Sequence, residues 1–352
     1  MAISEKLELI FKRVLPAPFT IAVLLTFLTF ILALFITEPN SEQKHLIQLF
    51  IFWEQGVWNP PMLVFAMQMM LMLVLGHTLA LSRPINYLIS KAVKYCDNTA
   101  NAASIITFFT ILVSLFNWGL GLIFGAIFAR KVGEYASAKN IHLNYPLIGA
   151  AGYSGLMVWH GGISGSAPIK IAEEGHFLAD KIGIVSQAET IFSNMNIFTS
   201  IALLIILPLI VYYLGKKNQG VNVKILAEKK EKKLELSGAE KLDHNSLLAR
   251  TFGGIIILYA IYKAIIIPDN ISLNVITPNY INLVLLGFAI IAHKNFFNFL
   301  TSINSAIVGA SGILIQFPLY FGIMGVMNYS GMLDIMSNFF VNISNETTFP
   351  IF

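Results

Sequence analysis

A long uncharged stretch in the first half of this chain decides how it folds. Residues 103–129 read ASIITFFTILVSLFNWGLGLIFGAIFA and contain no charged side chain. A straight α-helix of this length is about 40 Å long, at about 1.5 Å per residue, whereas the hydrocarbon core of a bilayer is about 30 Å thick. The sequence Asn117-Trp118-Gly119-Leu120-Gly121 interrupts the stretch at its centre. The excess length and the central break predict a re-entrant hairpin, which enters and leaves the membrane on one side.

The composition of the whole chain agrees with a membrane location. Of its 352 residues, 56% are apolar and only 12% are charged, about half the charged share of an average soluble domain. This composition excludes a soluble globular enzyme and a disordered chain. The net charge is only +4 and no basic patch interleaves with aromatics, which excludes a nucleic-acid binder. One cysteine, and seven histidines without metal-ligand spacing, predict no metal site, and no motif predicts a cofactor.

Further apolar runs predict an all-α polytopic membrane protein with about seven or eight crossings and one or two re-entrant hairpins. The run at 18–36 is uncharged over its whole length, which is about enough to cross hydrocarbon. It lacks a signal-peptide cleavage site, so we expect it to remain as a membrane segment. The other runs lie at 62–81, 145–172, 198–214, 250–267, 280–292, 300–327 and, more weakly, 332–343.

Loop charges predict the orientation, because Lys and Arg accumulate on the cytoplasmic side of membrane proteins. The net charge alternates in sign from loop to loop, except that 82–102 and 130–145 are both positive. A hairpin at 103–129 restores the alternation and places the N-terminus and the lysine-rich loop 216–243 in the cytoplasm. The alternative is that 103–129 crosses the membrane once and that the loop charges deviate from the rule at this point.

The lysine-rich loop also divides the chain. We expect a first membrane half at 1–215, a charged cytoplasmic loop at 216–248 and a second, incomplete membrane half at 249–352. The run at 300–327 contains Gln316-Phe317-Pro318, which predicts a second interruption matching the one at 103–129. Two halves with matched interrupted segments are typical of carriers built from internal repeats.

Helix breakers are concentrated inside the run at 145–172. Residues 159–168 read WHGGISGSAP. Glycine leaves helical conformation at little cost, and Pro168 suits the first turn of a new helix better than the interior of an old one. We therefore expect a broken transmembrane helix. Non-helical backbone at membrane depth either lines a cavity or is buried in protein.

The new helix expected near Pro168 predicts a site for a small carboxylate. Ser164 or Ser166 would cap this helix, and a helix N-terminus offers free N–H donors and partial positive charge to an anion. The candidate binding residues of this cradle are Gly161, Gly162, Ser164, Gly165, Ser166 and Pro168. Alternatively, the glycines form a kink that permits tight helix packing.

A few side chains near the breaks are candidates for binding or coupling. His160 is the only ionisable group in the breaks. The pKa of a histidine lies near neutrality, which suits proton uptake and release. Alternatively, a neutral His160 fixes the break by hydrogen bonding. Asn117 and Trp118 can bind a carboxylate or satisfy the backbone of their own turn. Gln316 occupies the matching place in the second half. We expect Lys170 to extend toward the membrane interface.

A rival hypothesis from another class begins at Gly162-Ile163-Ser164-Gly165. This matches the G-x-S-G around the nucleophile of intramembrane serine proteases of the rhomboid type, with His293 as a candidate base. The four-residue match is weak in a chain with 25 glycines, and His293 adjoins a lysine at a predicted membrane edge. We therefore expect the chain not to be an enzyme.

Short motifs spread over the chain form a recognisable set. They are Arg13-Val14-Leu15-Pro16, Asn117-Trp118-Gly119, Gly152-Tyr153-Ser154-Gly155, the run from Trp159 to Pro168, and Gln316-Phe317-Pro318-Leu319-Tyr320. Together they resemble the short-chain fatty acid transporter family, the AtoE type, within the ion transporter superfamily. The resemblance extends over the whole chain, and the His-Gly-Gly-x-Ser-Gly-Ser-Ala-Pro run is its most specific part.

This resemblance implies a secondary carrier in the bacterial inner membrane. Its substrates would be short-chain fatty acids such as butyrate or acetoacetate, taken up by symport with protons. The resemblance assigns substrate binding to Asn117, Trp118, Gly119, residues 160–168 and, more weakly, Gln316, with His160 as the proton carrier. The nearest alternative is a Na⁺-coupled carrier of other small carboxylates. Superfamily relatives are often dimers, so by analogy alone we expect a homodimer.

One departure from the family pattern concerns the end of the chain. Members of the family continue beyond this point and carry a second glycine-rich motif of the Pro-Ser-Gly-Gly-Gly-Gln-Trp kind, which this sequence lacks. The sequence therefore leads us to expect a C-terminally truncated chain. An inactive fragment is the corresponding alternative to a working carrier.

Overall fold

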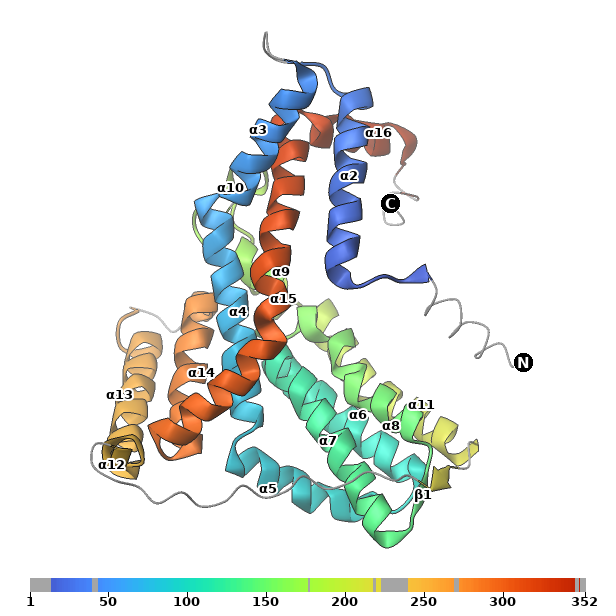
Figure 1. Cartoon of the computed structure of the whole chain (residues 1–352), viewed down its shortest axis with the longest axis vertical. Helices are drawn as coiled ribbons and strands as arrows, with labels where there is room; N and C mark the ends of the chain where they lie inside the picture. The colour runs from blue at the N-terminus through green and yellow to red at the C-terminus, as the bar shows by residue number, and fades with distance from the viewer. Residues whose placement is uncertain are drawn as a thin grey trace. The chain divides into compact units, whose positions relative to one another are not determined.

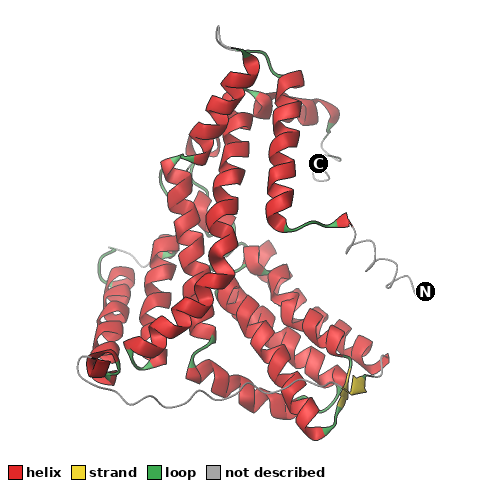
Figure 2. Cartoon of the chain, viewed as in Figure 1, coloured by secondary structure: helices red, strands yellow, loops and turns green. Residues whose placement is uncertain are grey.

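Helices form nearly all of the regular structure in the computed structural model of this chain (Figure 2). The structure describes residues 14–39, 44–176, 178–217, 220–222, 240–268, 272–345 and 348. The α-helices, labelled in Figure 1, are α2 Pro18–Ile36, α3 His45–Val57, α4 Pro60–Ala80, α5 Arg83–Ala92, α6 Thr99–Phe116, α7 Trp118–Lys139, α8 Tyr145–Tyr153, α9 Ser166–Ile171, α10 Ala179–Ile182, α11 Asn194–Lys217, α12 Glu240–Asp243, α13 Ser246–Ile265, α14 Pro278–His293, α15 Phe296–Tyr329 and α16 Met332–Ile343.

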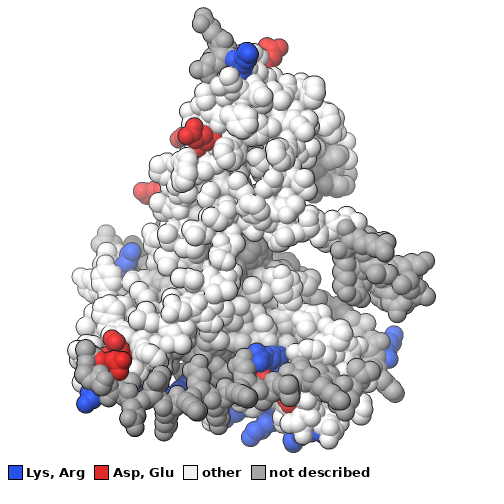
Figure 3. Space-filling view, in the orientation of Figure 1, with Lys and Arg blue, Asp and Glu red and all other residues white. Residues whose placement is uncertain are grey.

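The helices confirm the expectation of an all-α polytopic membrane protein. Among the described residues, α2, α4, α6, α11, α13 and α15 are long and apolar enough to cross a membrane, and α14 and α16 are shorter apolar helices. Uncharged atoms cover most of the face shown in Figure 3. Many large apolar side chains are exposed on these helices, as is normal for surfaces that face lipid. The total of seven or eight crossings stays a prediction.

The chain divides into two compact units. Unit 1 comprises residues 1–67 and 311–352, and unit 2 comprises residues 68–310. The division predicted from the sequence differs, because it uses the charged loop as the boundary between two halves. That division, at 1–215, 216–248 and 249–352, stays a prediction. Most of the predicted cytoplasmic loop, residues 218–219 and 223–239, lies outside the described residues.

In unit 1, helix α3 was not predicted, because its residues lie between the apolar runs at 18–36 and 62–81. Helix α3 packs closely on α15: a Cβ atom on Gly56 would lie 2.3 Å from the carbonyl oxygen of Phe321. A buried cluster holds the same elements together and includes Phe30, Leu49 and Val326. The approach of two backbones through small residues is typical of membrane helices.

In unit 2, helices α6 and α7 form the predicted hairpin. The chain reverses at Asn117, which is the C-cap of α6 and the N-cap of α7. The two arms pack against each other, because a Cβ atom on Gly121 of α7 would lie 2.0 Å from Ser114 Oγ of α6. The predicted interruption is therefore confirmed at Asn117, whereas residues 118–121, also predicted to lie in the turn, are helical and begin α7, which extends to Lys139, beyond the predicted end. That both arms open to the same side of a membrane stays a prediction.

The second interruption, predicted at Gln316-Phe317-Pro318, is wrong. Helix α15 continues through Pro318 over 34 residues. Proline removes one N–H donor from a helix, but membrane helices tolerate it where neighbouring groups satisfy the freed carbonyl. A break in hydrocarbon would expose several more backbone groups, so the continuous helix is the less costly structure. The described residues therefore provide no second break to match the α6–α7 hairpin.

A buried core in unit 2 anchors the hairpin to the rest of the unit. It includes Cys96, Ile106, Phe128, Val132 and Ile148, all with no exposed surface. Leu143 of this core lies in strand β1 His142–Leu143, which pairs antiparallel with strand β2 Val221–Asn222. The pairing ties the segment after α7 to the segment after α11.

The thiol of the single cysteine, Cys96, is buried and unreactive. Cys96 has no exposed surface. Burial, and then the neighbouring Asp97 carboxylate, raise the pKa of the Cys96 thiol to about 12. Because the thiolate is the reactive form, this thiol stays unreactive at neutral pH.

Single-cysteine variants therefore report membrane sidedness without removing Cys96. A re-entrant hairpin places Ser90 and Ala138, which are exposed before and after it, on one side. The loop charges place exposed Ala188 on the opposite side. In inverted vesicles, a membrane-impermeant maleimide should label Ser90→Cys and Ala138→Cys but not Ala188→Cys. The unsubstituted chain is the control. Labelling of Ser90→Cys and Ala138→Cys from opposite sides would establish a single crossing.

Candidate functional site

The predicted broken helix is present, and it begins to unwind earlier than the sequence suggests. Helix α8 ends at Tyr153 and is followed by two 3₁₀ turns, η2 Ser154–Met157 and η3 Trp159–Gly161. Residues 162–165 are non-helical, and α9 begins at Ser166. The break is therefore confirmed at 159–168, and Pro168 lies within the first turn of the new helix as expected.

The broken segment bonds to the tip of the hairpin. The backbone N–H of Trp118 donates to Ser164 Oγ over 2.9 Å, in a fully buried contact. The N–H of Ile163 donates to the carbonyl oxygen of Leu115 over 2.8 Å. These bonds join the end of α6, the start of α7 and the break into one site. Unit 2 thus brings together the predicted residues 117–119 and 160–168.

The predicted capping role of Ser164 or Ser166 is wrong. The N-cap of α9 is Gly165, and no side chain accepts a hydrogen bond from the first turn of this helix. Ser164 accepts from Trp118 instead, because the hairpin tip leaves an N–H at the start of α7 that needs a partner. Helix α9 is also only six residues long, so its dipole is small.

Close contacts explain the glycines of the break. A Cβ atom on Gly162 would lie 2.6 Å from the carbonyl oxygen of Leu115, and one on Gly165 would lie 2.4 Å from that of His160. A Cβ atom on Gly161 would lie 2.6 Å from Asn196 Oδ1 on α11. The glycines therefore permit tight packing, which was the alternative interpretation. Packing and substrate binding are compatible, because the contacts fix the backbone that would form the cradle.

At the hairpin tip, Asn117 and Trp118 each keep a free donor. Asn117 Oδ1 accepts from the N–H of Leu120 over 2.7 Å, so the oxygen satisfies its own turn. The amide nitrogen of Asn117 and the indole nitrogen of Trp118 are buried and have no hydrogen-bond partner among the described residues. Asn117 has no exposed surface and Trp118 retains 8%. Two buried, unpaired N–H donors are costly unless they meet an acceptor.

Two glycine residues let the hairpin tip pack closely against helix α4. A Cβ atom on Gly119 would lie 2.9 Å from Cα of Leu73, and one on Gly76 would lie 2.6 Å from Asn117 Oδ1. Sequence reasoning singled out Gly119 from the family motif but missed Gly76. The contact explains why both positions are small.

Aromatic rings extend from the tip to His160. The Trp118 and Trp159 rings meet edge to face with centroids 5.3 Å apart, and the Trp159 and His160 rings lie 4.3 Å apart. The His160 side chain is exposed on unit 2. This exposure would let its imidazole exchange protons with water.

A cavity of about 350 Å³ adjoins the break, and Gly161, Gly162 and Ile163 contribute to its lining. Most of its walls are apolar, and its polar side chains are Asn196 and Ser200 of α11. Asn196 Nδ2 donates to the carbonyl oxygens of Gly161 over 2.9 Å and Ile191 over 2.7 Å, so it holds the break in place. Sequence reasoning missed both residues, and their only signal is the i, i+4 spacing on one apolar helix. The lining residues are Leu112, Leu115, Phe116, Gly161, Gly162, Ile163, Ile191, Phe192, Asn196, Ile197, Ser200 and Ile201.

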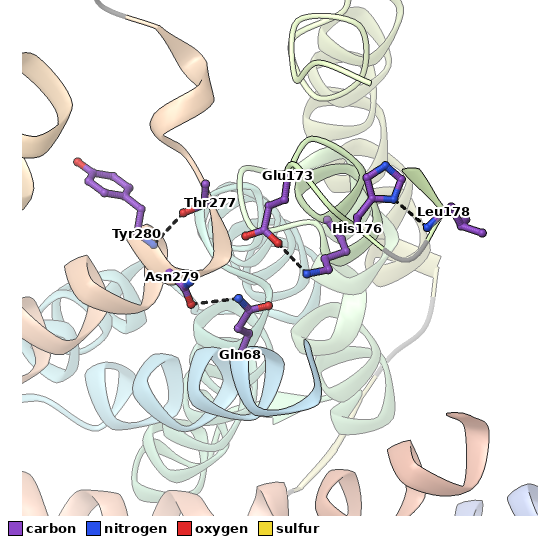
Figure 4. A network of polar contacts seen from close by, with 8 residues as sticks. Gln68, Glu173, His176, Leu178, Thr277, Asn279 and Tyr280 are labelled. Atoms are coloured by element: carbon purple, nitrogen blue, oxygen red, sulfur yellow. Dashed lines mark hydrogen bonds and ion pairs between the residues drawn. The ribbon is translucent and has the colours of Figure 1, made fainter. Parts of the chain in front are cut away.

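Charged and polar pairs flank the site. Lys170 Nζ lies 2.7 Å from Glu173 Oε2, in the ion pair drawn beside Glu173 in Figure 4. Gln68 Nε2 donates to Asn279 Oδ1 over 3.0 Å and so links α4 to α14. The sequence did not indicate a partner for Lys170. Its approach to a membrane interface stays a prediction.

Gln316 lies in unit 1, in the continuous helix α15, and is half-buried. No break surrounds it, so the structural reason for pairing it with Asn117 is lost. Its role in binding stays a prediction from the family resemblance.

The contacts of Ser164 and His293 do not form a protease dyad. Ser164 Oγ bonds to the N–H of Trp118, and His293 bonds to the carbonyl oxygen of Ala289 and to Ser302 Oγ. A serine nucleophile needs its base within hydrogen-bond reach. Among the described residues, no group of three or more His, Cys, Asp or Glu side chains could hold a metal ion.

Comparison with known proteins identifies relatives along the whole chain. A family profile described as Short chain fatty acid transporter matches residues 1–352. A protein of Escherichia coli (strain K12), provisionally named short-chain fatty acid transporter, is 33% identical, with 99% of this chain and 77% of that protein covered. A protein of Haemophilus influenzae with the same provisional name is 32% identical, with 99% and 78% covered. No solved structure matches the chain.

Replacing Ser164 should weaken the junction between the hairpin and the break. Ser164→Ala leaves the buried N–H of Trp118 without an acceptor, which should lower the free energy of unfolding by about 1–3 kcal/mol. Thermal unfolding in detergent measures the change. Ser166→Ala is the matched control, since no side-chain hydrogen bond of Ser166 supports α9. Equal stability of the two variants would contradict the assigned role of Ser164.

Proposed function

This chain belongs to the short-chain fatty acid transporter family, and we propose that it takes up short-chain fatty acids by proton-coupled secondary transport. The substrates would be monocarboxylates such as butyrate or acetoacetate. The membrane would be the bacterial inner membrane, with the N-terminus in the cytoplasm. Family membership supports transport across a membrane, and the site described above supports a small carboxylate as the substrate.

The observation that supports this proposal most directly is the pair of unpaired donors at the hairpin tip. A carboxylate offers acceptor oxygens and negative charge, and charge-assisted hydrogen bonds are stronger than neutral ones. The amide of Asn117 and the indole N–H of Trp118 are buried donors of neutral side chains. They can therefore hold a carboxylate while it is away from water, without forming a permanent ion pair that would prevent its release.

The cavity beside the break suits the apolar end of the same substrate. Its volume of about 350 Å³ is at the small end of the range for ligand pockets, which is about 300–1,000 Å³. Its mostly apolar walls match a short acyl chain. Because Gly161, Gly162 and Ile163 line the cavity and Ser164 bonds to Trp118 at the hairpin tip, the backbone at 161–165 would contact the substrate between its two ends. The close contacts of Gly161, Gly162 and Gly165 with neighbouring protein atoms would hold this backbone in place beside the substrate.

His160 is the proposed proton carrier. It is exposed and its ring contacts Trp159, which in turn contacts Trp118 at the donor pair. Protonation of His160 would therefore change the electrostatic environment beside the bound carboxylate. A Na⁺-coupled carrier is the second candidate, because backbone carbonyls of a broken segment can also bind Na⁺.

Uptake of labelled butyrate into proteoliposomes tests the function and the coupling ion. An inward proton gradient should drive accumulation at constant Na⁺, and His160→Gln should lose this gradient dependence. A Na⁺ gradient at constant pH should have no effect. Accumulation driven by Na⁺ alone would support the second candidate instead. Failure of both gradients to drive uptake of butyrate or acetoacetate would contradict the proposed substrate class.

Trp118→Phe tests the donor pair. This change keeps the aromatic ring against Trp159 but removes the indole N–H. A hydrogen bond to a charged group contributes about 1.5–3 kcal/mol, so the KM for butyrate should rise about 10- to 100-fold. Trp58→Phe is the matched control, because Trp58 is 66% exposed and lies in unit 1. An unchanged KM in Trp118→Phe would show that the indole does not bind the substrate.

A further inference from the structure

A second cavity of unit 2 lies away from the proposed substrate site. It has a volume of about 470 Å³ and lies where α4 passes into α5, beside the start of α13 and the end of α14. Figure 1 shows α13 and α14 side by side, and Gly253 permits their close approach, since a Cβ atom there would lie 3.0 Å from the carbonyl oxygen of Gly287. The substrate proposal uses none of the residues that line this cavity.

Two cations stand at the rim of the cavity. Arg250, near the start of α13, and Lys294, which follows α14, both line it and are both exposed. Lys294 has a φ of 69°, in the left-handed region, and is the C-cap of α14. Neither cation forms an ion pair with an acidic side chain in the described part of the chain. None of the described residues that line the cavity is acidic, so the rim attracts an anion.

A buried hydroxyl without a partner lines the same cavity. Ser82 has no exposed surface, and its Oγ has no hydrogen-bond partner among the described residues. Ser82 is the N-cap of α5, yet its side chain does not cap that helix. A serine at this position normally bonds to the first turn, and a buried hydroxyl left unpaired is costly. An acceptor within the cavity would remove this cost.

The remaining walls are apolar. Leu79, Ile85, Phe288 and Ile291 contribute to them. The ligand must therefore combine an anionic head with an apolar chain, because a small free anion would leave these walls uncovered. Leu79 lies at the end of α4 and Ile291 at the end of α14, so the cavity is at the level where membrane helices end. Lipid head groups occupy this level of a bilayer.

Helix α5 supports an interfacial position. Its exposed side chains include Tyr87 and Leu88, and Lys91 Nζ lies 4.6 Å from the centre of the Tyr87 ring. Tyrosine and lysine at the end of a membrane span are typical of the head-group region. The loop-charge pattern predicts that 82–102 faces the cytoplasm, where anionic lipids attract basic residues.

We propose that this cavity binds one anionic phospholipid. The phosphate would lie between Arg250 and Lys294 and accept a hydrogen bond from the Ser82 hydroxyl. One acyl chain would cover the apolar wall formed by α4, α5 and α14. The lipid would thus join α13 and α14 to the α4–α5 corner of unit 2. This proposal does not depend on the transported substrate.

Lipid binding to the purified full chain in neutral detergent tests the proposal. Native mass spectrometry should show one retained dioleoyl phosphatidylglycerol, and this lipid should raise the thermal unfolding midpoint with a saturable dose dependence. Dioleoyl phosphatidylcholine and water-soluble glycerol phosphate should do neither. An equal effect of phosphatidylcholine would indicate non-specific lipid. An equal effect of glycerol phosphate would indicate a free-anion site, and either result would overturn the proposal.

Two double variants test which basic residues bind the lipid. Arg250→Gln with Lys294→Gln should weaken phosphatidylglycerol binding about 10-fold or more, because each basic residue adds to the attraction for anionic lipid. Lys91→Gln with Lys94→Gln removes the same charge from nearby exposed positions outside the cavity lining, and should bind like the unsubstituted chain. Equal weakening in both double variants would overturn the proposal.

A further variant keeps every charge, and it tests lipid binding even if the double variant fails to fold. Ala292 lines the apolar wall, so Ala292→Phe should fill the space for the acyl chain. It should abolish the saturable stabilisation by phosphatidylglycerol while Arg250 and Lys294 remain. Full lipid affinity in Ala292→Phe would overturn the proposed position of the chain.

Discussion

The architecture of unit 2 depends on one constraint: a backbone that leaves helical conformation in hydrocarbon must find hydrogen bonds within the protein. Two irregular segments, the hairpin tip and the break at 159–168, satisfy each other. The Trp118 N–H bonds to Ser164 Oγ, and the Ile163 N–H bonds to the Leu115 carbonyl. Each segment therefore depends on the other for these hydrogen bonds. Their pairing fixes the place where a substrate could meet exposed backbone.

Small residues make this pairing sterically possible. Ser114 of α6 lies between Gly121 of α7 and Gly155 of the unwound turn, with Oγ about 2 Å from the Cβ position of each. Gly125 and Gly152 bring α7 and α8 together in the same way. Because these contacts leave no space for a side chain at the glycines, they hold the hairpin and the break closely together. The unpaired donors of Asn117 and Trp118 are thus preorganised for an acceptor, rather than free to rotate toward another partner.

Two of the places where the described part of unit 2 holds buried polar groups without partners differ in their charge. At the hairpin tip the groups are neutral donors beside an apolar cavity, which suits a ligand that must bind and leave. At the α4–α5 corner a hydroxyl lies with two cations, which suits a ligand that stays. The difference in charge follows from depth: an unpaired cation in hydrocarbon is expensive, whereas one at the interface retains contact with water and head groups.

The sequence by itself determined the apolar segments, the two breaks in the first half and the family. These follow from local properties: the bounds of α2 and α16 are those of their apolar runs, and the asparagine and glycine residues mark the break positions. Tertiary structure alone decided that α15 runs through Pro318, that Ser164 bonds to a residue 46 positions away rather than capping α9, and that Asn196 and Ser82 line cavities. Local sequence gives backbone preference, but a hydrogen-bond partner or cavity wall depends on which distant helices pack together.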